Sequence, residues 1–269
     1  MNLTNLLLST GLSLFFLGLV FIPMEKAFPA KVNQFVFRKK WFLDLCYFLG
    51  QYLIWSSLVL KAIEFFGQWI QAQIDIPFQT TIGKQPLWLQ VLEVLILSDF
   101  FIYWAHRLQH KYDFLWRFHK VHHSAETLDW LAAHREHPLD SIYTVGIINL
   151  PAILFGFDLN SIAILVAFRG IWAIYIHSNV RLNLGFVKKL IGSPDLHHWH
   201  HDKERDRGNY ANLSPIMDIV FGTYVCPDFE PENFGIKEDF PQNYIGQMIK
   251  PMLPNSVWNI FNSKNISSK

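Results

Sequence analysis

Long apolar runs alternate with shorter polar connections along this chain. A helix needs about 20 mostly apolar residues to cross the roughly 30 Å hydrocarbon core of a bilayer. Five runs approach that length: residues 6–22, 42–60, 87–104, 139–157 and 162–176. The last two are only just long enough, so they form either two full spans or a hairpin that dips into the bilayer. The pattern predicts an all-α integral membrane protein with four to five membrane helices, organised as a single membrane domain over residues 1–269.

Composition agrees with a membrane location. Hydrophobic residues make up 51% of the chain and charged residues 17%, whereas about 25% is usual for the charged residues of soluble domains. The net charge of +1 and the lack of a basic run give no reason to expect a nucleic-acid partner. The first apolar run lacks a basic flank and a small-residue cleavage signal, so we expect a retained helix rather than a signal peptide. Two cysteines, Cys46 and Cys226, are too few for a disulfide framework.

Lysine and arginine gather in every second connection between the apolar runs. Residues 23–41, 105–138 and 177–207 are rich in them, whereas the connection between the second and third runs carries only Lys61 and Lys84. Cytoplasmic loops of membrane proteins carry this positive bias. The rule predicts a multi-pass protein whose basic connections, and the histidines within them, face the cytoplasm.

All 12 histidines fall between His106 and His201. Residues three or four apart share one face of a helix, with Cβ atoms about 5–6 Å apart, so the dense groups offer imidazoles to common points. One ion seldom takes more than about four to six ligands, so eight or more clustered histidines predict two metals. Imidazole alone suits zinc, iron and copper. The groups are His106 and His110; His119, His122 and His123; His134 and His137; His177; and His197, His198, His200 and His201.

Acidic and phenolic residues near these groups are candidates for orienting ligand rings. Asp99 and Tyr103 share a helical stripe with His106 and His110. We expect Asp99, with Tyr103 beside it, to hold a ligand histidine through its other ring nitrogen. Asp195 is a candidate for the same role or for the N-cap of a helix that carries the last group.

Several motifs around the histidines resemble the fatty acid hydroxylase and sterol desaturase superfamily of membrane di-iron enzymes. They are H-x-x-x-H at 106–110, H-x-x-H-H at 119–123, R-E-H-P-L-D at 135–140, H-S-N at 177–179 and H-x-W-H-H at 197–201. The resemblance covers about residues 95–225, the histidine-box region of the single domain. It implies a helical bundle whose cytoplasmic, histidine-lined cap holds two irons.

When the ligand positions of the family are carried over to the matching motifs, the resemblance implies a set of histidine ligands. Some relatives have a further histidine at the position of Ala173, so we expect His137 to supply a tenth ligand. His134 and His198 stay outside the expected set as neighbours or bystanders. The implied metal ligands are His106, His110, His119, His122, His123, His137, His177, His197, His200 and His201.

The implied activity is oxygen-dependent hydroxylation or desaturation of a lipid C–H bond by an oxidoreductase. It would use two iron ions, which zinc can replace in a purified sample, with dioxygen as co-substrate and a lipid within the bilayer as substrate. No nucleotide fingerprint or haem motif is present, so electrons must come from a separate donor protein or a diffusible reductant. Two alternatives stay open at this stage: a histidine-rich metal-binding or metal-transport membrane protein, and a bis-histidine haem protein.

Overall fold

The computed structural model describes residues 2–73, 79–157, 163–204, 208–254 and 256–258, and these residues are mainly helical. Two isolated β-bridges, Pro29 with Val180 and Asp202 with Phe234, are the extended pairings within this part of the chain. The elements are α1 (Leu3–Ala27), α2 (Trp41–Gly50), the π-helical turn η1 (Gln51–Trp55), α3 (Ser56–Gln73), α4 (Gln79–Ile82), α5 (Leu87–Lys111), α6 (Asp113–His123), η2 (Ala132–His134), α7 (Pro138–Phe155), α8 (Ala163–His177), η3 (Gly185–Lys189), α9 (Pro194–His200), α10 (Ile216–Val220), α11 (Tyr244–Ile249) and η4 (Lys250–Met252).

Four helical segments of the described chain are long and apolar enough to cross a membrane. They are α1, the continuous 33-residue segment Trp41–Gln73, α5 and α7. Within the described residues helix α8 has 15 residues, fewer than the roughly 20 that a full crossing needs. The predicted all-α membrane architecture is therefore confirmed at four candidate spans. Residue 162, the start of the fifth apolar run, lies outside the described residues, and the rest of that run forms α8.

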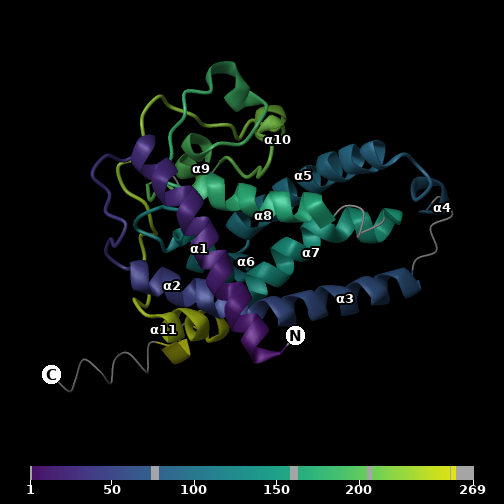
Figure 1. Cartoon of the computed structure of the whole chain (residues 1–269), viewed down its shortest axis with the longest axis horizontal. Helices are drawn as coiled ribbons and strands as arrows, with labels where there is room; N and C mark the ends of the chain where they lie inside the picture. The colour runs from purple at the N-terminus through teal and green to yellow at the C-terminus, as the bar shows by residue number, and fades with distance from the viewer. Residues whose placement is uncertain (1, 74–78, 158–162, 205–207, 255, 259–269) are drawn as a thin grey trace.

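The long helices leave the histidine-bearing segments at one end of the molecule. Helix α7 packs against both α3 and α5, and all three extend toward α4 on the right of Figure 1. The short helices α6 and α9 lie toward the opposite end of this bundle (Figure 1). Tyr244 and Met248 of α11 pack there against α2 and α6. We call the end of the molecule that carries α6 and α9 the cap.

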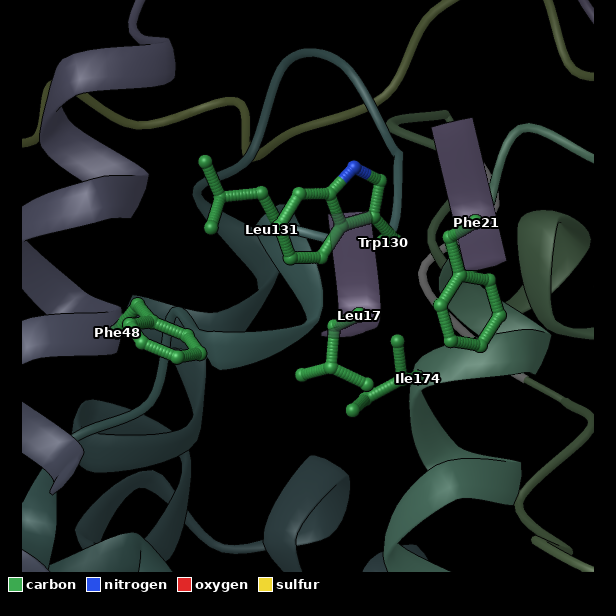
Figure 2. Packing of buried hydrophobic residues seen from close by; sticks show 6 residues of the cluster. All are labelled: Leu17, Phe21, Phe48, Trp130, Leu131 and Ile174. Carbon is green, nitrogen blue, oxygen red and sulfur yellow. The ribbon is translucent and has the colours of Figure 1, made fainter. Parts of the chain in front are cut away.

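A buried apolar cluster fastens α1 to the cap. Figure 2 shows Leu17 and Phe21 of α1 beside Trp130, with Ile174 of α8 facing the same space. Burying an aliphatic or aromatic side chain of this size stabilises a fold by about 1.5–3 kcal/mol. Because Ile174 lies one helical turn before His177, this packing also fixes the end of α8 that carries the histidine.

Two prolines start helices at the edge of the cap. Pro138 and Pro194 occupy the first turns of α7 and α9, where the fixed φ of proline suits a helix start and no N–H is lost. Ser193, in extended conformation, is the N-cap residue of α9. The expectation that Asp195 caps this helix is therefore wrong, since Asp195 lies within its first turn.

Candidate metal centre

Nine of the ten predicted histidine ligands come together in two groups. Within each group the candidate ligand atoms all lie within 4.8 Å of one another. The first group is His106, His110, His119, His123 and His200, and the second is His122, His177, His197 and His201. These nine are the proposed metal ligands.

Helical spacing explains why α6 and α9 contribute to both groups. His119 and His123 are four residues apart and share one face of α6, while His122 points to the neighbouring face. At α9, His197 and His201 are four apart and join the second group, and His200 joins the first. The spacing of the histidines along each of these two segments therefore supplies rings to both groups.

The Nε2 atoms of the rings converge. In the first group, Nε2 of His119 lies 3.0 Å from Nε2 of His106 and 3.2 Å from Nε2 of His123. In the second, Nε2 of His177 lies 2.9 Å from that of His122 and 2.8 Å from that of His197. Such separations between ring nitrogens require either a shared proton or a cation close by.

Backbone carbonyls next to the rings indicate which ring nitrogen carries the proton. Nδ1 of His106 lies 2.8 Å from the carbonyl oxygen of Tyr210, and Nδ1 of His177 lies 2.6 Å from that of Ala173. Nδ1 of His200 and of His122 face further carbonyls, at 2.8 and 3.2 Å. A carbonyl only accepts, so each Nδ1 must carry the proton, and each neutral ring then presents a bare lone pair at Nε2.

Burial keeps these rings neutral. It lowers the pKa of His119, His122 and His123 well below the ordinary value, and neighbouring histidines lower it further. The pKa values of His197, His200 and His201 are lowered for the same reasons. Converging lone pairs on neutral rings repel one another unless a metal ion lies between them, so the residues present fit two bound metals.

A carboxylate that the sequence reasoning missed orients one of the rings. Oδ2 of Asp140 lies 2.9 Å from Nδ1 of His119, and Gln109 donates to its other oxygen at 2.7 Å. Carboxylates in this position fix the tautomer of a metal-bound histidine and raise its basicity. The available signal was the motif R-E-H-P-L-D, in which Asp140 falls in the first turn that Pro138 starts.

The three residues predicted to orient ligand rings have other partners. Asp99 accepts from Nη2 of Arg169 on α8 at 2.6 Å, and the Tyr103 hydroxyl lies 3.0 Å from Oγ1 of Thr223. Asp195 lies 3.9 Å from Nζ of Lys188. The expectation for Asp99 is corrected because packing of α8 on α5 supplies a cation inside the bundle, which compensates the buried carboxylate more strongly than a neutral imidazole would.

The structure places His137 outside both groups. Its Nδ1 accepts from the backbone N–H of Leu139 as the N-cap of α7, and its Nε2 lies 3.1 Å from the carbonyl oxygen of Met248. The tenth ligand expected at this position is therefore corrected: the imidazole caps the helix that Pro138 begins.

His134 and His198 also face away from the two groups. Nδ1 of His134 lies 2.9 Å from Oε1 of Gln51, beside the π-helical turn. His198 contacts Oε2 of Glu230 through Nδ1 at 2.6 Å and the carbonyl of Ser178 through Nε2 at 3.1 Å. Both histidines help to hold the cap together.

Residues 91–223 match the family model named fatty acid hydroxylase. An ornithine lipid hydroxylase of Rhizobium tropici is 30% identical over 62% of this chain and 51% of its own length. The human alkylglycerol monooxygenase is 36% identical over 50% of this chain and 29% of its own length. A Δ7-sterol 5(6)-desaturase of Gibberella zeae is 29% identical over 56% and 43%. The chain thus spans about half or less of the length of these relatives, and no solved structure matches it significantly.

Proposed function

Because its segment 91–223 makes this chain a member of the fatty acid hydroxylase family, we propose that it is a membrane-bound di-iron oxidoreductase. It would use dioxygen to hydroxylate or desaturate a C–H bond of a lipid. The observation that carries the proposal is the convergence of nine histidines into two adjacent groups at one end of a bundle with four membrane-length segments.

The donor set favours iron over zinc. The first group offers five imidazoles, whereas zinc in proteins is almost always bound by about four ligands, and zinc has no redox chemistry. Bound iron would supply the activation of dioxygen that attack on an unreactive C–H bond requires. The protein's own residues hold the metals, fix the ring tautomers through Asp140 and the backbone carbonyls, and exclude water through burial.

The relatives and the charge pattern of the chain support proposals for the substrate and the electron source. The relatives are named for an ornithine lipid, an alkylglycerol and a sterol, and we propose a lipid that enters from the bilayer. Its reacting carbon would reach the histidine groups while its polar end stays near the cap. We further propose that the cap faces the cytoplasm, where a separate donor protein or a diffusible reductant would deliver electrons.

Metal analysis and lipidomics together test this function. Purified protein should contain two irons per chain, and a host that expresses it should accumulate an oxygenated or more unsaturated lipid only when dioxygen is present. His122→Ala should remove that product because it takes a ligand from the second group. Protein without iron, together with identical lipid profiles for wild type and His122→Ala, would refute the proposal.

A further inference from the structure

A cavity of about 660 Å³ is lined by residues that follow α1 and α8 in the chain, by one residue of α9 and by one of the C-terminal segment. Phe28 and Pro29, at the end of α1, form part of its wall together with Arg181, Lys188 and Asp195. Cavities of this size commonly hold small molecules. We infer that this cavity binds the zwitterionic head group of a lipid, an inference that rests on the proposed function and names the polar part of its substrate.

Asp195 supplies the acidic end of the cavity. Its side chain is buried, and its Oδ1 has no hydrogen-bond partner among the residues that the structure describes. Its Oδ2 lies 3.9 Å from Nζ of Lys188 and 4.0 Å from Sγ of Cys226. A buried carboxylate oxygen without a donor is costly. Because Asp195 lines the cavity, a cationic group of a ligand there, such as an ammonium, would compensate the charge of this carboxylate.

Lys188 and Arg181 supply the basic side. Nζ of Lys188 is 3.7 Å from Asp228 as well as 3.9 Å from Asp195, and both separations exceed hydrogen-bond length. Arg181 contacts Glu230 at 3.2 Å and remains partly exposed. The lining therefore presents two cations and two carboxylates, and charge complementarity favours a ligand that carries both signs.

The apolar surroundings identify the ligand as a lipid rather than a soluble zwitterion. Phe28 ends a helix that is long enough to cross a membrane, and its side chain is 52% exposed. Phe186 and Leu190, on either side of Lys188 in the chain, are 69% and 51% exposed. Exposed apolar side chains at the end of a membrane helix are typical of the bilayer interface, where a head group could enter the cavity while its acyl chain stays in the bilayer.

The cavity is built from the same segments that carry the second histidine group. Arg181 follows His177 by four residues, and Asp195 precedes His197 by two. A head group held between these side chains would therefore be anchored at a fixed distance from the proposed metals. That distance would select which carbon of the lipid reaches them.

Lipid binding to the purified full chain tests the inference without turnover. The probes are three lipids with the same single acyl chain: lysophosphatidylethanolamine, which is zwitterionic; lysophosphatidylglycerol, which is anionic; and neutral monoacylglycerol. Affinity is measured from the ligand-dependent rise in unfolding temperature in a neutral detergent. We expect the zwitterionic lipid to bind tightest. Lys188→Gln should weaken both phospholipids roughly tenfold through loss of a charge-assisted hydrogen bond.

Variants of the acidic side and a matched control complete the experiment. Asp195→Asn should abolish the preference for the ethanolamine head group over glycerol. Asp228 is exposed, so Asp228→Asn is a second test that holds even if Asp195→Asn fails to fold, and it should reduce the same preference. Lys189→Gln, at an exposed position that does not line the cavity, should bind like the wild type. Equal binding of all three lipids, or equal effects of Lys188→Gln and Lys189→Gln, would overturn the inference.

A head group without an acyl chain separates a lipid site from a site for a soluble zwitterion. Glycerophosphoethanolamine should bind far more weakly than the lysolipid, and equal affinities would overturn the assignment to a lipid. Because the assay needs neither iron nor dioxygen, its failure is distinct from failure of the proposed oxidoreductase. If the lipid product is lost while head-group selectivity is intact, only the proposed oxidoreductase activity is refuted.

Discussion

Asp140 shows how one side chain can tune a site without being a ligand. Its carboxylate contacts Nδ1 of His119 and is itself held by Gln109. We predict that Asp140→Asn lowers the affinity of the first group for metal by about 10–100-fold, the usual cost of losing such an outer partner. Metal retention during titration with a chelator, followed by mass spectrometry of bound iron, measures this. Asp239→Asn, at an exposed position, is the control, and equal retention by both variants would contradict the role.

The register of α9 gives a second prediction at this scale. His200 belongs to the first group, while its neighbour in the same helix, His198, contacts Glu230 and Ser178 instead. His200→Ala should lose metal from the first group, whereas His198→Ala should keep both metals and lose only some stability. Metal counts per chain distinguish the two. A large loss at His198 with none at His200 would show that the ligand assignment has the wrong register.

Residue patterns predicted the histidines of the site better than their partners. The spacing of His119, His122 and His123 follows directly from helix geometry, and the structure brings all three into the two groups. The pairing of Asp99 with Arg169 depends on how α8 packs against α5, which no local pattern contains. The role of His137 was missed for a related reason, because a cap forms only once Pro138 has started a helix.

At the scale of elements, a buried network of charges joins α2 to the segment before α7. Asp44 on α2 lies 2.8 Å from Nη2 of Arg38 and 2.6 Å from Nε of Arg135. Arg38 also contacts Asp129 at 2.6 Å, so two cations balance two carboxylates. The carbonyl of Arg135 in turn faces Nδ1 of His122 at 3.2 Å. The network therefore connects the placement of α2 to a ring of the second histidine group.

Removing the central carboxylate should destabilise the cap strongly. Asp44→Ala leaves two buried guanidinium groups short of a partner, a change that typically costs about 3–5 kcal/mol. The expected result is a clear fall in unfolding temperature, measured in detergent on metal-free protein so that loss of metal does not contribute. Glu204→Gln breaks an exposed ion pair with Lys237, worth about 0–1 kcal/mol, and serves as the control. Similar unfolding temperatures for both variants would rule out a structural role for the network.

Helix positions were more predictable than helix lengths. The apolar runs located α1, α5 and α7, yet the second run continues as one helical segment to Gln73. The extension carries Glu64 and Gln68 among its apolar residues, so composition alone ended the predicted run too early. The π-helical turn at Gln51–Trp55 has no separate sequence signal, because its apolar residues suit an α-helix equally well.

At the scale of the whole molecule, the proposed metal ligands, the proposed head-group cavity and the basic connections all lie at one end of the helical bundle. Helices α5 and α8 both end there, at Lys111 and His177. The connection between α4 and α5, which carries Lys84, lies at the other end (Figure 1). This polarity suits the proposed lipid-modifying site, because acyl chains would lie along the bundle and head groups at its end.

The polarity predicts opposite accessibility for two lysines. In a background with Cys46→Ala and Cys226→Ser, a membrane-impermeant maleimide should label Lys84→Cys in intact cells. Lys189→Cys should react only after permeabilisation, because the positive-inside rule predicts that the cap faces the cytoplasm. Both positions are exposed, so reactivity reports the side of the membrane rather than burial. The reverse pattern would place the histidine groups outside the cell, and labelling of both positions in intact cells would show that α5 does not separate them across a bilayer.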